Sequence, residues 1–216
     1  MIENVIFDMD GTILYTLEDL KNSTNTALKM FGYQEKTVDE IKTFVGNGVR
    51  KLIERALPAE TPSDITEHVL KVFKEDYTKN MYKNTKPYDN IKKLMLNLKE
   101  NRIKTAVVSN KFDLAVKELC EKYFDGLIDI SVGQSDNISP KPSPDGILKA
   151  MRILNANTEN CIYTGDSDID VTAAHNADLK CIGVTWGYRD LSVLTASGAD
   201  YIANEPLEIW NLIKNV

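Results

Sequence analysis

The chain has 216 residues, of which 43% are hydrophobic and 27% are charged, and its formal net charge is −6. This composition is typical of a globular protein with a buried core, and it excludes the disordered and fibrous classes. The acidic balance argues against nucleic-acid binding and against an anionic membrane surface, because both require basic residues that face phosphates.

The cysteines and the start of the chain indicate a reduced compartment. Cys120, Cys161 and Cys181 are widely spaced in apolar runs, and this spacing matches neither a zinc site nor a redox pair. Residues 1–7 resemble a short strand and not a signal sequence. We therefore expect a cytoplasmic protein with buried thiols.

Five short apolar runs rich in valine and isoleucine predict buried strands, at residues 5–7, 105–108, 127–130, 161–163 and 181–184. Helical patterns separate them, at residues 90–101, 113–123, 145–154 and 170–177. Alternation of this kind predicts the α/β class, with a parallel sheet and helices on both of its faces.

One segment interrupts the alternation. Between residues 15 and 85 the apolar residues recur at helical spacing, and Thr37 with Glu40 three residues later forms a capping-box signature. We therefore expect residues 15–85 to form an inserted helical domain, and residues 1–14 and 86–216 to form the domain that contains the sheet.

Polar residues follow four of the predicted strands. In a parallel sheet, ligands bind beyond the carboxyl ends of the strands, so these positions are the candidates for chemistry. The segments are Asp8-Met9-Asp10-Gly11-Thr12, Ser109-Asn110-Lys111, the loop that contains Lys141, and Gly165-Asp166-Ser167-Asp168-Ile169-Asp170.

These residues match the needs of phosphomonoester hydrolysis, which are a nucleophile, neutralisation of the phosphoryl charge, and a proton for the leaving oxygen. Asp8 is the expected nucleophile, which forms an aspartyl-phosphate, and Asp10 is the expected proton donor. Ser109 and Lys141 are expected to bind the phosphoryl oxygens. The expected substrate contacts in this domain are Thr12 and Asn110.

A carboxylate nucleophile and a phosphate repel each other, and a hard divalent cation between them relieves the repulsion. Mg²⁺ prefers a few carboxylates together with carbonyl and water oxygens. The expected ligands are Asp8, the backbone carbonyl of Asp10, Asp166 and, as a near or outer ligand, Asp170.

The motifs resemble those of the haloacid dehalogenase-like hydrolase superfamily. DMDGT at residues 8–12 is similar to the first motif of that superfamily, DxDGT, and Ser109, Lys141 in SPKPSPD and GDSDID at residues 165–170 are similar to its later motifs. Within the superfamily the chain resembles the phosphoglycolate phosphatase group, through VGNGVRKLIERAL, VVSNK and GDSDIDVTAAHNA.

This resemblance implies a Rossmann-like parallel sheet core with an inserted all-helical cap domain that closes over the site. It also implies that the turn Gly46-Asn47-Gly48 and Arg50 contact the substrate, and that the substrate is a small phosphorylated metabolite, with 2-phosphoglycolate as the best single expectation. Family members often have aspartate where Tyr15 stands and glycine where Asp178 stands. The protein is expected to act as a monomer or a homodimer.

Several alternatives stay open. A phosphomutase similar to β-phosphoglucomutase is one, although those proteins usually have valine at the position of Thr12, and a pyrophosphatase of the same superfamily is another. A dehalogenase attacks carbon without a metal and lacks the second acid that Asp10 supplies. The non-enzymatic alternative is a phosphoryl-binding regulatory module such as a receiver-like domain, which has no helical insert.

Overall fold

The computed structural model describes residues 1–215, and the chain divides into two compact units. One unit consists of Met1–Tyr15 together with the chain from Pro87 onward, and it contains the parallel sheet. The other unit is Thr16–Lys86, which contains four helices among its described residues.

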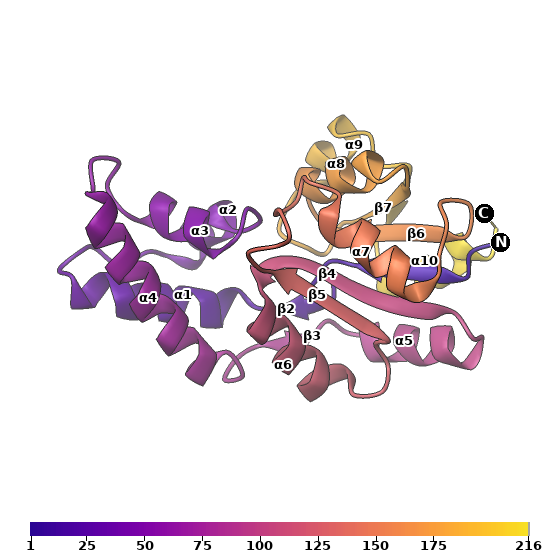
Figure 1. Cartoon of the computed structure of the whole chain (residues 1–216), viewed down its shortest axis with the longest axis horizontal. Coiled ribbons are helices and arrows are strands. Elements are labelled where there is room, and N and C mark those ends of the chain that lie inside the picture. Colours follow the sequence, from indigo (N-terminus) through magenta and orange to yellow (C-terminus); the bar gives the residue numbers. More distant parts are fainter. Residues whose placement is uncertain (216) are drawn as a thin grey trace. The chain divides into compact units, whose positions relative to one another are not determined.

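The sheet has six strands in the order β5-β4-β1-β6-β7-β8, and every neighbouring pair is parallel (Figure 1). This confirms the predicted α/β class. The strands are β1 (Asn4–Phe7), β4 (Lys104–Phe112), β5 (Ile130–Gln134), β6 (Cys161–Gly165), β7 (Lys180–Val184) and β8 (Tyr201–Ala203). Two further short strands, β2 (Leu14–Tyr15) and β3 (Lys86–Pro87), form a separate two-stranded sheet.

The strand predicted at residues 127–130 was wrong in position, because β5 begins only at Ile130 and continues to Gln134. The backbone N–H of Leu127 donates to the carbonyl of Phe124, so this part of the run is a turn after a helix. The Asp129 carboxylate accepts the backbone N–H of Thr105 at 2.8 Å and so anchors the approach to the strand. Strand β8 was not predicted at all.

Helices cover both faces of the sheet. They are α5 (Ile91–Glu100), α6 (Asp113–Phe124), α7 (Asp145–Leu154), α8 (Asp168–Asn176), α9 (Leu191–Ala196) and α10 (Pro206–Ile213). Figure 1 shows α7, α8 and α9 on one side of the sheet and α5 and α6 on the other. One buried cluster joins Ile6 and Val108 of the sheet to Ile147 of α7 and Val171 of α8. This packing holds the start of α8 beside the end of β6.

The order of the strands determines where a ligand can bind. β1 lies between β4 and β6, and the chain adds β4 and β5 on one side of β1 before it crosses to β6 on the other. Such a switch point leaves a crevice at the carboxyl ends of the central strands. The residues after β1, β4 and β6 therefore meet at one edge of the sheet.

The helical unit contains α1 (Leu17–Met30), α2 (Val38–Phe44), α3 (Val49–Ala56) and α4 (Ser63–Asn80). The rings of Phe73 and Tyr77 stack at 5.5 Å in its core. The capping box predicted for Thr37 and Glu40 is confirmed at the start of α2. The buried carboxylate of Asp19 accepts the backbone N–H groups of Asn84 and Thr85, which fastens the end of the unit to α1.

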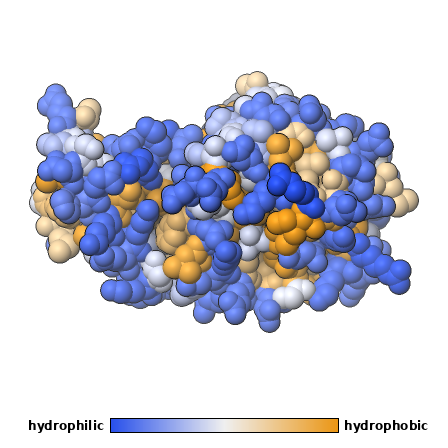
Figure 2. All heavy atoms as spheres, in the orientation of Figure 1, coloured by the Kyte–Doolittle hydropathy of each residue, from blue (hydrophilic) through white to orange (hydrophobic). Residues whose placement is uncertain are grey.

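The surface seen in Figure 2 is mostly hydrophilic, with smaller hydrophobic patches. Among the described residues, the large apolar side chains that are exposed are scattered along the chain: Met1, Met30, Leu96, Leu114, Leu148, Ile153 and Leu191. Within the described part of the chain, no helix combines the length and apolar character needed to cross a membrane.

Candidate active site

Asp8 follows β1 directly, and its position is fixed by the sheet. All four residues of β1 are buried, and the backbone N–H of Asp8 continues the ladder by donating to the carbonyl of Thr164 at 2.9 Å. The Asp8 side chain is itself buried, and one oxygen, Oδ1, accepts a hydrogen bond from Lys141 Nζ at 2.7 Å.

Lys141 reaches this edge from the loop between β5 and α7. Its backbone N–H donates to Asn110 Oδ1 at 2.7 Å, and Asn110 Nδ2 donates to the Lys141 carbonyl at 3.0 Å, so Asn110 fastens the loop to the end of β4. Lys141 Nζ also donates to Asp170 Oδ1 at 2.6 Å and to the hydroxyl of Tyr163 at 2.9 Å. Burial alone would lower the pKa of Lys141, but Asp170 and Asp8 raise it, so the ammonium form is favoured.

Asp170 is oriented by the start of α8. Ser167 begins that helix, its Oγ accepts the backbone N–H of Asp170, and Asp170 Oδ2 accepts both the backbone N–H and the hydroxyl of Ser167. A reciprocal capping box of this kind stabilises a helix start. It also leaves Asp170 Oδ1 directed to Lys141 and Tyr163.

Asp166 follows β6 and is enclosed from two sides. Oδ2 accepts the backbone N–H of Tyr188 at 2.6 Å, and Oδ1 accepts the hydroxyl of Thr12 at 3.2 Å. The carbonyl of Thr12 in turn accepts the indole N–H of Trp186 at 2.9 Å, so the segment after β1 and the segment after β7 are joined beside Asp166.

Three carboxylates converge at this edge. One oxygen from each of Asp8, Asp166 and Asp170 lies within 4.8 Å of the others, and all three residues are buried. Burial raises the pKa of Asp8 to about 7 against the opposing charge of Lys141. Burial, Asp170 and Asp8 raise the pKa of Asp166 well above its ordinary value.

This donor set fits a hard divalent cation. Three carboxyl groups, those of Asp8, Asp166 and Asp170, converge here, and the Lys141 ammonium contacts two of them. In their ionised forms the three acids outnumber the positive charges of Lys141 and of Arg189, which acts on Asp166. Oxygen ligands are those that Mg²⁺ and Ca²⁺ prefer, and a cation here would favour the ionised acids against the burial and the mutual repulsion that raise their pKa values.

Asp10 and Ser109 lie at the same edge. Asp10 Oδ2 is 3.1 Å from Lys111 Nζ, and Ser109 Oγ accepts the backbone N–H of Lys111 at 3.3 Å. Ser109, Asn110 and Lys141 line one small cavity. The structure thus brings together, at one edge of the sheet, the site residues that were predicted from the sequence for the sheet-containing domain.

Two contacts were missed by sequence reasoning. Lys111 was named within the segment after a strand, but no role was predicted for it from the sequence. Its position directly after Ser109-Asn110 could have indicated that it belongs to the site. Tyr163 lies inside a buried strand, and its hydroxyl contacts both Lys141 and Asp170. No sequence signal separates this tyrosine from an ordinary core aromatic residue.

The remaining predicted residues belong to the helical unit. Gly46 and Gly48 have φ values of 123° and 86°, which are readily adopted by glycine, and Gly48 begins α3. Asn47 Oδ1 accepts a hydrogen bond from Arg55 Nη2 at 2.7 Å, and Arg50 Nη2 pairs with Glu67 Oε1 at 2.7 Å. Arg50 therefore already has a carboxylate partner within its own unit.

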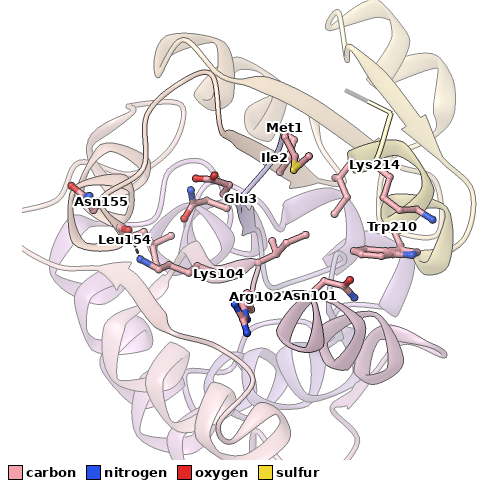
Figure 3. Close-up of a pocket in the computed structure, with 13 residues that line it drawn as sticks. Met1, Ile2, Glu3, Asn101, Arg102, Lys104, Leu154, Asn155, Trp210 and Lys214 are labelled. Atoms are coloured by element: carbon pink, nitrogen blue, oxygen red, sulfur yellow. Dashed lines mark hydrogen bonds between the residues drawn. The ribbon is translucent and has the colours of Figure 1, made fainter.

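A separate hollow of about 600 Å³ lies at the amino ends of β1 and β4, and Trp210 and Lys104 are among its lining residues (Figure 3). Lys104 Nζ donates to the carbonyl of Leu154, the last residue of α7, at 2.9 Å, and Lys214 directly follows α10. Helix C-termini favour cations, so these lysines have a structural explanation. We assign the hollow no part in the chemistry of the carboxylates.

The comparisons with known proteins agree with this geometry. A family model described as haloacid dehalogenase-like hydrolase matches residues 5–184. A phosphoglycolate phosphatase of Aquifex aeolicus is 32% identical over 216 residues, which cover 98% of this chain and 96% of that protein. A candidate pyrophosphatase, PpaX, of Caldanaerobacter subterraneus is 31% identical over 215 residues, which cover 99% and 94%.

A solved structure gives the same result for the fold. The crystal structure of a candidate phosphoglycolate phosphatase from Lactobacillus delbrueckii subsp. bulgaricus superposes with a TM-score of 0.93 at 34% identity. The match covers 98% of each chain.

Proposed function

The chain belongs to the haloacid dehalogenase-like hydrolase family and is a phosphatase similar to phosphoglycolate phosphatases, and from this premise we propose a Mg²⁺-dependent hydrolysis of small phosphomonoesters through an aspartyl-phosphate. The observation that carries the proposal is the convergence of the Asp8, Asp166 and Asp170 carboxylates. It is supported by the contact of Lys141 with both Asp8 and Asp170.

In the first step of the proposed reaction, an Asp8 oxygen attacks phosphorus and the bond to the leaving oxygen breaks. The electron pair of that bond goes to the leaving oxygen, which takes a proton from the Asp10 carboxyl group. In the second step, Asp10 takes a proton from water, the water oxygen attacks the aspartyl-phosphate, and inorganic phosphate leaves Asp8. Both carboxyl groups return to their starting states.

Asp8, the backbone carbonyl of Asp10, and Asp166 would hold the Mg²⁺, with Asp170 as a near or outer ligand. When bound, the ion supplies positive charge beside the phosphoryl oxygens as Asp8 approaches them. Lys141 holds Asp8 and Asp170 in place and adds a second positive charge. Ser109, Thr12 and Asn110 are proposed to orient the phosphoryl group.

We also propose 2-phosphoglycolate as the substrate, on the basis of the relatives that carry that name. In this proposal residues 15–85 act as a cap, and Gly46, Asn47, Gly48 and Arg50 contact the part of the substrate beyond the phosphate. Because Arg50 is paired with Glu67, it would have to exchange that carboxylate for one on the substrate.

The test of the reaction uses phosphate release together with chemical trapping. With Mg²⁺ present, the wild-type protein is expected to hydrolyse 2-phosphoglycolate, and Asp8→Asn is expected to lose about 10⁴-fold or more of kcat, because the nucleophile is gone. Borohydride reduction during turnover should convert residue 8 to homoserine, as detected by mass spectrometry. Full activity of Asp8→Asn, or trapping at another residue, would overturn the proposal.

A second candidate substrate is pyrophosphate, because one relative is named as a candidate pyrophosphatase at an identity similar to that of the phosphoglycolate phosphatases. Comparison of kcat/KM for pyrophosphate, 2-phosphoglycolate, sugar phosphates and nucleotides under identical Mg²⁺ conditions decides between them. A higher kcat/KM for pyrophosphate would replace the substrate assignment and leave the proposed chemistry at Asp8 unchanged.

A further inference from the structure

A second buried lysine lies at the site and has a different partner from Lys141. Strand β4 extends to Phe112 beside the much shorter β1, so it continues past Asp8 and carries Lys111 to the segment that follows β1. The Lys111 side chain is 1% exposed and that of Asp10 is 13% exposed, and Lys111 Nζ lies 3.1 Å from Asp10 Oδ2.

The two lysines contact different carboxyl groups. Lys141 contacts Asp8 and Asp170, which belong to the convergent set, whereas Lys111 contacts Asp10, which does not. A buried ion pair costs desolvation free energy and is often no more stabilising than apolar residues of similar volume. Stability alone therefore gives little reason for a lysine at this position.

The backbone of Asp10 is already fixed without Lys111. The N–H of Gly11 donates to the carbonyl of Leu14, and the N–H of Leu14 donates to the carbonyl of Met9, which closes a tight turn around Asp10. What this turn leaves undetermined is the orientation of the Asp10 carboxyl group. The contact of Lys111 with Oδ2 acts on that carboxyl group directly.

We propose that Lys111 is a positioning residue that holds Asp10 Oδ2, so that Oδ1 is the oxygen that carries and returns the proton. This inference rests on the proposed function, in which Asp10 protonates the leaving oxygen. As the bond to phosphorus breaks, the proton on Oδ1 moves to the leaving oxygen and Asp10 becomes a carboxylate beside the Lys111 ammonium. Water restores the proton to Oδ1 in the second step.

A positioning role for Lys111 has a kinetic signature. A good leaving group departs without a proton, whereas an alkoxide needs one, so loss of proton delivery slows poor leaving groups selectively. A residue that binds the phosphoryl group directly, or one that only stabilises the fold, would affect all phosphomonoesters to the same degree. The dependence of kcat/KM on the leaving group thus separates these roles.

The experiment measures kcat/KM for dinitrophenyl phosphate, phenyl phosphate and an alkyl phosphate, with wild type, Lys111→Met, Lys111→Arg and Asp10→Asn. For Lys111→Met we expect a loss of about 10-fold to 100-fold with the alkyl phosphate and less than about 3-fold with dinitrophenyl phosphate, because misplacement of a reacting group has effects of this size. Lys111→Arg should recover most of the loss. The inhibition constant of inorganic phosphate should stay unchanged.

Lys117→Met is the matched control, since it removes an ion pair between Lys117 and Asp113 on the exposed surface of α6. It should leave kcat/KM unchanged for all three substrates. Melting temperatures show whether each variant is folded. If Lys111→Met does not fold, Lys111→Gln, which can still donate a hydrogen bond to Oδ2, should show the same selective loss at a smaller size.

Two failures are distinguishable. If Asp10→Asn slows poor leaving groups selectively but folded Lys111 variants lose activity uniformly or bind phosphate more weakly, the positioning role is wrong and the proposed function stands. If Asp10→Asn itself slows all three substrates equally, Asp10 is not the proton donor, and the proposed chemistry fails together with this inference.

Discussion

At the scale of single residues, three glycines allow the backbone to pack directly against the carboxylates of the site, because they have no Cβ. Gly11 has a φ of 90°, and a Cβ there or at Gly187 would collide with the Asp166 carboxylate. A Cβ at Gly165 would likewise collide with Asp170. Any larger residue at these three positions has to displace an acid that is proposed to bind the metal.

Gly11→Ala is expected to lower activity strongly. The alanine adds strain at a positive φ, which costs about 1 kcal/mol, and its methyl group displaces the carboxylate of Asp166. We expect a loss of at least about 10-fold in kcat/KM and a higher Mg²⁺ requirement. Phosphate release as a function of Mg²⁺ concentration measures both effects.

Gly32→Ala is the control for Gly11→Ala, because Gly32 also has a positive φ but no atom lies near its Cβ position. It should lower the melting temperature without any change in the Mg²⁺ requirement. If Gly11→Ala had the same Mg²⁺ requirement as wild type, the close approach at Asp166 would be irrelevant to the metal.

At the scale of elements, a helix start and a strand end share residues with the site. Ser167 begins α8, and it also donates its hydroxyl to Asp170 Oδ2 at 2.6 Å. The same serine therefore stabilises a helix and orients a carboxylate. Such outer contacts affect metal affinity as well as folding.

Ser167→Ala is expected to have both effects. Loss of the helix cap should destabilise the protein by about 1 kcal/mol, as measured by urea unfolding. Release of Asp170 should weaken Mg²⁺ activation by about 10-fold. Thr37→Ala, which removes the corresponding capping box of α2 in the helical unit, should cost similar stability without the loss of Mg²⁺ affinity. Equal Mg²⁺ affinities in the two variants would contradict this expectation.

The pairing of β7 with the segment before β8 predicts a pH-dependent contribution to stability. Asp200 Oδ2 accepts the backbone N–H of Cys181 at 2.9 Å and lies 3.0 Å from His175 Nε2. Partial burial alone would raise the pKa of Asp200, but these hydrogen bonds lower it below its ordinary value. A carboxyl group with a lowered pKa stabilises the fold above its unfolded pKa, and this stabilisation is lost as pH falls through the folded pKa.

Asp200→Asn should therefore reduce the free energy of unfolding by about 1 kcal/mol near neutral pH, and the difference from wild type should shrink as the pH falls below about 4. Urea unfolding at several pH values measures it. Asp178→Asn, an exposed change at a nearby position with φ of 57° that asparagine tolerates, is the control. A difference that grows toward acid pH would contradict the role of Asp200.

At the scale of the whole molecule, the chain consists of two units with their own buried cores. The proposed metal ligands Asp8, Asp166 and Asp170 all belong to the sheet-containing unit, although they are far apart in the sequence. A cation that binds them joins the first strand to the start of α8. Such binding adds to the stability of the folded state, because the unfolded chain does not hold these acids together.

Mg²⁺ is therefore expected to raise the melting temperature of the protein, with a stabilisation of about 2.7 kcal/mol at 100 times the dissociation constant. Asp166→Asn should abolish the shift, whereas Asp168→Asn, a neighbouring change at the first residue of α8, should retain it. The measurement is a thermal melt with and without Mg²⁺ after treatment with a chelator. An undiminished shift in Asp166→Asn would place the cation elsewhere.

The sequence by itself determined the class of the fold and the residues at the edge of the sheet. Alternating apolar runs and helical patterns require a parallel sheet, and polar residues after consecutive strands must meet at one edge of it. Asp8, Asp166 and Lys141 were selected in this way, and the structure brings them together. Local signals with a direct chemical cause, such as the Thr37 capping box, were also readable.

Only the tertiary structure decided which acid pairs with which lysine. The sequence placed Lys111 and Lys141 at the same edge of the sheet. In the structure, the extension of β4 past β1 brings Lys111 into contact with Asp10. The hydrogen bonds of Asn110 with the loop hold Lys141 where it contacts Asp8 and Asp170. Likewise, Leu127 lies in a turn although it belongs to an apolar run that predicted a strand. Tyr163 lies within a strand, and its hydroxyl nevertheless contacts Lys141 at the site. The physical reason is that pairing depends on distances between segments remote in sequence, whereas residue patterns report only local conformation and burial.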